Sequence, residues 1–504
     1  MLIRAKRALV SVYDKSGLKE LVSLLALHNI EIISTGNTYK TIKNVSQNVI
    51  QLAEYTGSPE ILEGRVKTLH PKIHAGLLAD RSNPEHVSFM QQNQILFIDL
   101  VIVNFYPFQS CAKLENIDIG GPAIVRAGAK NYSQVCVLAD SSDYAGLKQE
   151  LEANGGATTH EFRREMAKKA FCITAQYDAW ISTWFGSKKE QKEDLGEDLR
   201  GNIFLGIAAK QKLRYGENPH QESKFYTSIN NQSQHFRQLQ GKELSYNNMV
   251  DADSGIKLVN DFAAPTVAII KHNNPCGVGC AKNIEAAYQL ALQCDPISSF
   301  GGVVACNKKV NKALAEKIIQ IFTELVVAPG FDRDALSVFS AKKNLRVLSY
   351  SHYQDEYEVR AALGGFLLQT QDNKLIEEAD CRVVSDSQPT TEQIKDMIFA
   401  QRVCKHVRSN AVVVVGNQRT LGIGSGQMSR IDSVKIAVSK NSVKGAVLAS
   451  DGFFPFPDCI VHSAKSGISA ILQPGGSIRD QEIIDVANKH NIVMVFTGYR
   501  HFRH

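Results

Sequence analysis

Short apolar runs alternate with amphipathic helical stretches along most of this chain. Residues 8–12 (ALVSV) form one such run, and residues 18–28 (LKELVSLLALH) then place four aliphatic side chains on one helical face. The same alternation continues at later segments, namely IDLVIVNF, SQVCVLAD, TVAIIKH, GGVVACN, NAVVVVGN, KGAVLASD and NIVMVFTGY. Strands that alternate with helices build βαβ units, so the sequence predicts an α/β fold.

The length of the chain predicts more than one domain. A chain of 504 residues is too long for a single hydrophobic core, and typical domain sizes suggest about three units. The charged stretch GSKKEQKEDLGEDLRGN (186–202) interrupts the apolar rhythm and is typical of a linker. We therefore expect one domain over residues 1–190 and another over residues 200–504.

Charge and cysteine usage narrow the class of protein. The 57 basic and 51 acidic residues leave a net charge of +6, which suits anionic small molecules. No basic run is interleaved with aromatic residues, so we expect no nucleic-acid partner. No apolar run approaches the roughly 18 residues of a membrane span, and the first residues lack a signal-peptide cleavage pattern. The ten cysteines mostly stand alone in apolar surroundings, which indicates reduced thiols and a cytoplasmic location.

Two loops that end strands carry small residues and begin helices. They are SVYDKSG (11–17) and STGNT (34–38). Unpaired N–H groups and the helix dipole attract phosphate at such positions, although ordinary N-capping by Ser and Thr is the alternative for either loop alone. Because both loops belong to one βαβ unit, where ligands bind at the carboxyl ends of the strands, together they favour a nucleotide-like monophosphate.

Cationic and polar residues follow in the same half of the chain. Arg65 and Lys67 would point the same way if their segment is extended. Tyr106 follows the end of the strand in NFYPF. Asp118 precedes a helix and Lys130 ends it, so a helix N-cap and a lysine favoured by the helix dipole are the alternatives to catalytic roles.

The second half of the chain contains a lysine and a histidine side by side in VAIIKHNNPCGVGC (267–280). Adjacent side chains of a strand face opposite ways, but the Asn-Asn-Pro-Cys-Gly turn would let Lys271 and His272 converge on one site. A zinc deaminase would need HxE or CxE followed by PCxxC. Three residues separate Cys276 from Cys280, and no such glutamate motif precedes them at a suitable distance, so we expect no metal.

The motifs, taken in order, resemble a known family. SVYDKSG, STGNT, GRVKTLHP, NFYPF and IDIGGPAIVRAGAKN are similar to the IMP cyclohydrolase half of a bifunctional purine-synthesis enzyme family. KLRYGENPHQ, KHNNPCG, DPISSFGG, HVRSNAV, GIGSGQMSR, DGFFPFPD, QPGGSIRD and TGYRHFRH are similar to its AICAR transformylase half. The family often has a second glycine where Asn37 stands, and we expect Asn37 to tolerate a left-handed backbone there.

The resemblance implies both fold and activity. The fold would be an N-terminal Rossmann-like (methylglyoxal-synthase-like) domain plus a C-terminal domain of two metal-free, cytidine-deaminase-like α/β subdomains. The enzyme would transfer a formyl group from 10-formyltetrahydrofolate, a co-substrate, to AICAR, giving formyl-AICAR and tetrahydrofolate. It would then cyclise formyl-AICAR to IMP with loss of water. The family is a homodimer whose transformylase sites draw on both subunits.

The resemblance also implies roles for individual residues. For ring closure the catalytic set would be Lys67, Tyr106, Asp118 and Lys130, with Lys130 as the proton carrier. For formyl transfer it would be Lys271, His272 and Asn410. His272 would take the proton of the amine, Lys271 would stabilise the oxyanion or protonate the leaving folate nitrogen, and Asn410 would orient the base or the carboxamide.

Binding residues follow from the same motif positions. Those implied for the cyclohydrolase are Tyr13, Asp14, Lys15, Thr35, Gly36, Asn37, Thr38, Arg65, Thr68, Asn104 and Ile119. Those implied for AICAR are Arg214, Tyr215, Gly301, Glu324, Phe453 and Arg500, and those for folate are Arg430, Asp458, Ser477 and Ile478. The family often has Asp in place of Glu324, which changes the reach of that contact.

Two other classes of protein are alternatives. A zinc hydrolase of the deaminase type predicts stoichiometric zinc in the purified protein. An RNA-binding protein that uses the excess positive charge predicts RNA retention with a steep salt dependence.

Overall fold

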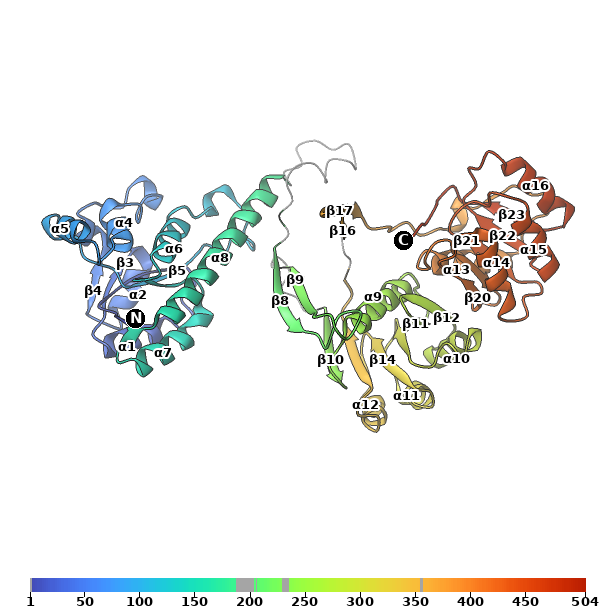
Figure 1. Cartoon of the computed structure of the whole chain (residues 1–504), viewed down its shortest axis with the longest axis horizontal. Coiled ribbons are helices and arrows are strands. Elements are labelled where there is room, and N and C mark those ends of the chain that lie inside the picture. Colours follow the sequence, from blue (N-terminus) through green and yellow to red (C-terminus); the bar gives the residue numbers. More distant parts are fainter. Residues whose placement is uncertain (1, 187–203, 205, 229–234, 354–356) are drawn as a thin grey trace. The chain divides into compact units, whose positions relative to one another are not determined.

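The computed structural model describes residues 2–186, 204, 206–228, 235–353 and 357–504 (Figure 1). The chain divides into two compact units, which are Met1–Ala208 with Thr227–Gln232, and Ala209–Tyr226 with Ser233–His504. Apart from Gly186, the charged stretch that we interpret as a linker lies outside the described residues. None of the helices in the described ranges is long and apolar enough to cross a membrane.

The first unit is built on a five-stranded parallel sheet in the order β4-β3-β2-β5-β6. Its central strands are mostly apolar and buried, as expected where helices cover both faces. Helices α1 and α7 cover one face, and α4 and α6 cover the other. The strands are β2 (Arg7–Val12), β3 (Glu31–Ser34), β4 (Val49–Gln51), β5 (Leu100–Asn104) and β6 (Cys136–Leu138).

The remaining elements of the first unit connect or cover these strands. The helices are α1 (Leu18–Leu27), α2 (Gly36–Lys43), α3 (Leu52–Thr56), α4 (Pro71–Leu78), α5 (Pro84–Gln92), α6 (Gly120–Lys130), α7 (Tyr144–Ala153) and α8 (His160–Gly186). Short 3₁₀ turns lie at Leu62–Gly64, Leu114–Asn116 and Ser141–Asp143. Strands β1 (Ile3–Arg4) and β7 (Ala157–Thr158) pair antiparallel. Strands β8 (Ile207–Lys212) and β9 (Lys224–Ser228) pair with each other, and each contains residues of both units.

The second unit contains two six-stranded sheets with the same topology. The first sheet has the order β10-β15-β14-β13-β11-β12, and the second has the order β18-β23-β22-β21-β19-β20. Each has an antiparallel hairpin at one edge (β11–β12 or β19–β20), three parallel strands in the middle, and an antiparallel strand at the other edge. The fold is therefore an α/β duplication, which we call the first and second repeat. The likeness of these repeats to cytidine deaminase stays a prediction.

The strands and helices of the repeats correspond in order. The first repeat contains β10 (Phe236–Gln240), α9 (Tyr246–Asn260), β11 (Thr266–Lys271), β12 (Asn274–Cys280), α10 (Ile284–Cys294), β13 (Gly302–Cys306), α11 (Lys312–Ile318), β14 (Thr323–Ala328), α12 (Arg333–Ser340) and β15 (Arg346–Tyr350). The second contains β18 (Arg382–Val383), α13 (Thr391–Cys404), β19 (Val412–Val415), β20 (Thr420–Gly424), α14 (Arg430–Ser439), β21 (Val447–Ser450), α15 (Asp458–Ser466), β22 (Ala470–Gln473), α16 (Asp480–Lys489) and β23 (Val493–Phe496). Between them lie the hairpin β16 (Tyr357–Ala362) and β17 (Gly365–Thr370), and a 3₁₀ turn at Glu378–Asp380.

The two repeats share a hydrophobic core. Helices α9 and α13 contribute side chains to one cluster together with residues of both sheets. The rings of Phe262 and Phe399 lie 5.1 Å apart within it. Strands β12 and β20 also meet, because the N–H of Val278 donates to Thr420 Oγ1 over 2.9 Å. These contacts hold the hairpin of the first repeat against that of the second.

Candidate functional site

A cavity of about 1090 Å³ opens at the carboxyl ends of β2, β3 and β5 in the first unit. This is the edge at which parallel α/β sheets bind ligands. The cavity is lined by every residue predicted to hold the cyclohydrolase nucleotide and by three of the four predicted catalytic residues of that site. They are Tyr13, Asp14, Lys15, Thr35, Gly36, Asn37, Thr38, Arg65, Lys67, Thr68, Asn104, Tyr106, Asp118 and Ile119.

The loop after β2 is held in place by Asn104, which ends β5. The Oδ1 of Asn104 accepts the N–H groups of Tyr13 and Asp14 over 2.6 and 3.1 Å, and its Nδ2 donates to the carbonyl of Asp14 over 2.9 Å. The rings of Tyr13 and Tyr106 pack edge to face with centroids 5.3 Å apart. The amide of Asn104 therefore orders the loop, and the two tyrosines form an aromatic wall of the cavity.

The loop after β3 begins α2, and the first residues of this helix line the cavity. Thr35 is the N-cap residue, but its side chain makes no capping hydrogen bond; its hydroxyl lies 3.0 Å from that of Ser11. The left-handed residue of this loop is Gly36, with φ of +40°. Asn37 lies inside α2 with a negative φ, so the expected left-handed backbone at Asn37 is wrong and glycine is not required there.

Lys67 reaches the cavity beside two residues that sequence reasoning missed. Its Nζ lies 3.6 Å from Glu60 Oε2, and both side chains are about two-thirds buried. Gly64 has φ of +85°, and a Cβ placed on it would lie 2.6 Å from Lys67 Cε. Gly64 therefore permits both the turn and the path of the lysine. The glycine in GRVKTLHP was visible in the sequence, whereas nothing there marked Glu60 as a partner of Lys67.

Asp118 lies at the start of α6, where its carboxylate accepts the N–H of Gly121 over 2.8 Å. Its own N–H donates to the hydroxyl of Tyr177 over 2.7 Å. Burial raises the pKa of Asp118, and hydrogen bonds from the backbone at Gly121 and Gly120 and the charge of Lys67 oppose this shift. Asp118 thus makes the contact expected at a helix start, and its carboxyl group, whose pKa is raised, also lines the cavity.

Lys130 is not brought to this cavity. It is the last residue of α6, whereas Asp118 lies just before the first, so roughly 15 Å of helix separates them at 1.5 Å per residue. Lys130 lines a different depression with Arg126, Tyr132 and Phe171. This position agrees with a helix-end lysine and does not support Lys130 as the proton carrier of the cavity.

In the first repeat, Lys271 ends β11 and a two-residue turn follows. The turn residues are His272 and Asn273, with φ of 52° and 60°, and β12 begins at Asn274. The expected longer turn through Pro275 and Cys276 is wrong, because both lie within β12. A two-residue turn with positive φ matches the twist of a hairpin, and β12 is an edge strand, where proline is tolerated.

His272 is exposed at this turn, and the residues on either side of it make hydrogen bonds. Lys271 Nζ donates to the carbonyl of Phe300 over 2.9 Å, and the N–H of Asn273 donates to Asp251 Oδ1 over 2.6 Å. Burial raises the pKa of the Cys276 thiol to about 12, which keeps it protonated. Within the described ranges, no cluster of three or more His, Cys, Asp or Glu side chains could hold a metal ion.

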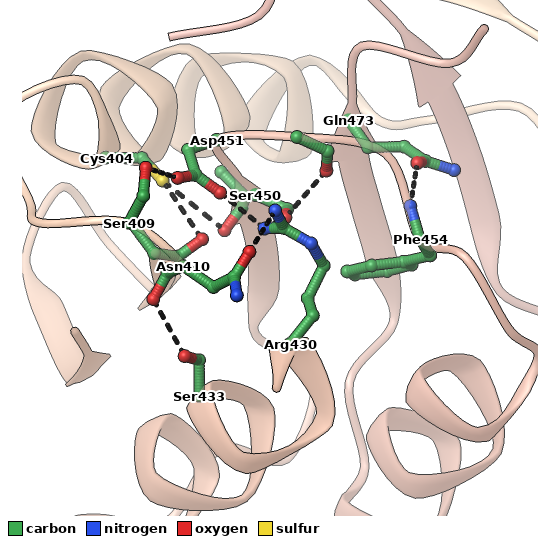
Figure 2. Close-up of polar contacts among 12 residues, drawn as sticks. Cys404, Ser409, Asn410, Arg430, Ser433, Ser450, Asp451, Phe454 and Gln473 are labelled. Carbon is green, nitrogen blue, oxygen red and sulfur yellow. Dashed lines mark hydrogen bonds and ion pairs between the residues drawn. The ribbon is translucent and has the colours of Figure 1, made fainter. Parts of the chain in front are cut away.

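The second repeat contains a buried polar cluster around Arg430 (Figure 2). Its guanidinium donates to Ser450 Oγ over 2.7 Å, to Asn410 Oδ1 over 2.7 Å, and to the carboxylate of Asp451, which also accepts from Ser409. The amide of Asn410 donates in turn to the carbonyl of Gln427 over 2.8 Å. Asn410 and Arg430 are therefore fixed by each other.

A cavity of about 390 Å³ lies beside this cluster. Four of the predicted transformylase residues line it, namely Asn410, Arg430, Phe453 and Asp458. The other predicted residues of this half lie elsewhere in the second unit. They are Arg214, Tyr215, Lys271, His272, Gly301, Glu324, Ser477, Ile478 and Arg500.

Several of these outlying residues have identifiable neighbours. Glu324 accepts from the buried guanidinium of Arg346 over 2.6 Å, so one of its oxygens is already engaged. The guanidinium of Arg500 lies 4.4 Å from the ring centroid of Phe502. Ile478 is fully exposed. The predicted folate contacts are thus not gathered around one cavity of a single chain.

One chain therefore joins a parallel-sheet unit, with a cavity at the carboxyl ends of its strands, to a duplicated α/β unit with a lysine–histidine turn. This combination is the one expected of a bifunctional enzyme. Residues 17–125 match the family model described as MGS-like domain, and residues 128–440 match the model described as AICARFT/IMPCHase bienzyme. The chain belongs to the AICARFT/IMPCHase bienzyme family.

Full-length relatives agree with this assignment. The bifunctional purine biosynthesis protein PurH of Rhodospirillum rubrum is 46% identical, and the match covers 99% of each chain. PurH of Caldicellulosiruptor saccharolyticus is also 46% identical, over 99% of this chain and all of its own. PurH of Parvibaculum lavamentivorans is 45% identical over 99% of this chain and 97% of its own.

Proposed function

We propose that the two units divide two consecutive reactions of purine biosynthesis between them. The chain is a bifunctional purine-biosynthesis enzyme with AICAR formyltransferase and IMP cyclohydrolase activities. We assign ring closure to residues 1–190 and formyl transfer to residues 200–504. The observation that carries the assignment is the cavity of the first unit, which gathers the whole predicted nucleotide-binding set.

In the first unit, the carboxamide nitrogen of formyl-AICAR attacks the formyl carbon. The formyl oxygen leaves as water, with one proton from the carboxamide nitrogen and one from the formamide nitrogen. The ammonium of Lys67 stabilises the charge that develops on that oxygen, and the N–H groups at the start of α2 bind the phosphate. Asp118 is the acid–base group of this cavity, because burial already favours its protonated form and Lys130 lies at the far end of α6.

In the second unit, the amine of AICAR forms a bond to the formyl carbon of 10-formyltetrahydrofolate. The bond from that carbon to the folate nitrogen then breaks. His272 takes the proton that the amine loses, and the leaving nitrogen gains a proton. Lys271, fixed by its hydrogen bond to Phe300, stabilises the tetrahedral oxyanion before the folate leaves.

A homodimer completes the transformylase site in this proposal. The predicted AICAR and folate contacts are divided between the two repeats, and Ile478 is fully exposed although it is a predicted folate contact. A second copy of the chain would cover such side chains and add the missing wall. We propose a cytoplasmic enzyme with small-molecule partners and no nucleic-acid partner.

The test is to incubate the full-length protein with AICAR and 10-formyltetrahydrofolate and to measure IMP and tetrahydrofolate. Supplied formyl-AICAR isolates the second reaction. We expect His272→Ala to abolish formyl transfer and to leave ring closure intact, and Lys67→Ala to do the reverse. Loss of both reactions in a folded variant would contradict the division between the units.

A further inference from the structure

Arg503 joins three separate segments of the second unit. Its backbone pairs with that of Ser409, since its carbonyl accepts the Ser409 N–H over 2.9 Å. Its Nη1 donates to the carbonyl of His406 over 2.5 Å and to Ser254 Oγ over 3.2 Å, and its Nη2 donates to Asn273 Oδ1 over 2.9 Å. One guanidinium thus connects the turn that carries the lysine–histidine pair with α9 and with the segment that precedes Asn410.

The conformation of the turn at His272 and Asn273 depends on contacts such as the one from Arg503. His272 and Asn273 both have positive φ, a conformation that costs free energy in residues other than glycine and that persists only where the surroundings fix it. Asn273 is fixed from two sides, because its N–H donates to Asp251 over 2.6 Å while its side chain accepts from Arg503. The position of His272 follows from that of its neighbour.

The equivalent turn of the second repeat shows which contact is general. Its residues Asn417 and Gln418 also have positive φ, 55° and 57°. Their N–H groups donate to Asp396 of α13 over 2.8 Å each, just as Asn273 donates to Asp251 of α9. A helix carboxylate therefore supports both turns, whereas Arg503 contacts the turn that carries Lys271 and His272.

The chemistry of the contact calls for a guanidinium. The Arg503 guanidinium donates to a backbone carbonyl, a hydroxyl and an amide oxygen, which are all uncharged, so these contacts are not ion pairs. Its two terminal nitrogens donate in fixed directions to acceptors on different segments, which the single nitrogen of a lysine cannot reproduce.

We propose that Arg503 is a positioning residue for formyl transfer that acts through Asn273. It fixes the His272 imidazole relative to the Ser409–Asn410 segment, to which its own backbone is paired. The proposal rests on the proposed role of His272 as the base.

A double-mutant cycle in the full-length enzyme tests this. Arg503→Lys keeps the charge, and Asn273→Gly keeps a backbone that accepts positive φ while removing Oδ1. Each change should lower kcat for formyl transfer about 10- to 100-fold, as expected when a catalytic group shifts by roughly 1 Å, with KM for AICAR changed only a few-fold. The double variant should be no slower than the slower single variant. Ring closure of supplied formyl-AICAR should be unchanged in all three.

Asn417→Gly is the matched control, because it makes the same Asn-to-Gly change at a left-handed position of the turn that lacks the lysine–histidine pair. It should leave kcat for formyl transfer within about two-fold of wild type. Effects of Arg503→Lys and Asn273→Gly that multiply in the double variant, or an unchanged kcat for Asn273→Gly, would overturn the proposal. If Arg503→Lys fails to fold, kcat of Asn273→Gly alone tests the proposal, because that variant removes the same hydrogen bond from its acceptor side.

His272→Ala in the same assay tests the role of His272 itself. If His272→Ala keeps normal formyl transfer, His272 is not the base, whatever the double-mutant cycle shows.

Discussion

Lys67 and Lys130 make a sharp test of the ring-closure site, because the sequence motifs implicate both and the structure places them apart. Lys67 lines the cavity of the first unit, with its Nζ 3.6 Å from Glu60. Lys130 ends α6, roughly 15 Å of helix away from Asp118. Replacing each lysine by alanine removes the same charge and the same side chain, so each variant is the control for the other.

The expected magnitudes differ for a physical reason. Removing a group that stabilises a developing oxyanion typically costs about 2.7–4 kcal/mol, which is a loss of about 100- to 1000-fold in kcat. Lys67→Ala should show this loss, and KM should rise as well, since the carboxylate of Glu60 is left uncompensated beside the cavity that we propose binds the anionic substrate. Lys130→Ala removes a charge near a helix end, where the effect on stability is about 0.3–1 kcal/mol, and ring closure should stay within a few-fold of normal.

The assay follows IMP formation from supplied formyl-AICAR, and then from AICAR with 10-formyltetrahydrofolate. With the second pair of substrates, Lys67→Ala should release tetrahydrofolate and accumulate formyl-AICAR, because formyl transfer continues while ring closure is slow. Loss of ring closure in a folded Lys130→Ala protein, with ring closure retained by Lys67→Ala, would contradict this assignment. It would show that ring closure does not take place in the cavity that Lys67 lines.

Three further outcomes follow from the site geometry. His272→Ala should lower formyl transfer, measured as tetrahydrofolate release, by at least about 100-fold, and it should leave IMP formation from supplied formyl-AICAR unchanged. Gly64→Ala should slow ring closure and lower the unfolding midpoint, because φ of +85° and a 2.6 Å approach to Lys67 both disfavour a Cβ; an unaffected variant would show that the turn adapts freely. Burial raises the pKa of Asp118 above its ordinary value of 3.8, so its protonated form favours the folded state below that value, and this contribution is lost as pH rises through the raised pKa. The stability of Asp118→Asn relative to wild type should therefore increase with pH over that window in unfolding titrations, and an unchanged difference would contradict the shift.

The alternation of apolar runs and helical stretches was enough to predict the α/β class, because burial on both sheet faces imposes it on the sequence directly. Part of the cavity of the first unit was predictable as well, since the loops at 11–17 and 34–38 follow strands whose carboxyl ends meet at one edge of the sheet. The residues between 65 and 68, and Asp118 with Ile119, do not follow strands directly and were assigned through the family resemblance. Glu60 and Gly64 were missed as partners of Lys67, because their effect depends on how a loop folds back on itself. Lys130 was placed with the others by its motif, although an eleven-residue helix moves its end away from the cavity.

The duplication was predicted by the family resemblance, which implies two α/β subdomains, and not by a repeated motif, because the repeats share topology without one. The hairpins of the two repeats share one contact and differ in the residues that their turns carry. In both, a helix carboxylate accepts from a turn of two left-handed residues: Asp251 accepts one N–H group, and Asp396 accepts two.

The first turn exposes His272, whereas the second contributes to its support. The carbonyl of Gln418, in the second turn, accepts the N–H of Cys280 over 3.0 Å, and Thr420 beyond it bonds to Val278. Both acceptors belong to the hairpin of the second repeat, and both donors lie on β12, the strand that follows His272. The second hairpin therefore contacts the edge of the first sheet through the Gln418 carbonyl and the Thr420 hydroxyl, and fixes the strand that follows His272. These contacts do not involve the side chain of Asn417, and Arg503 adds a contact to the turn of His272 from a third segment.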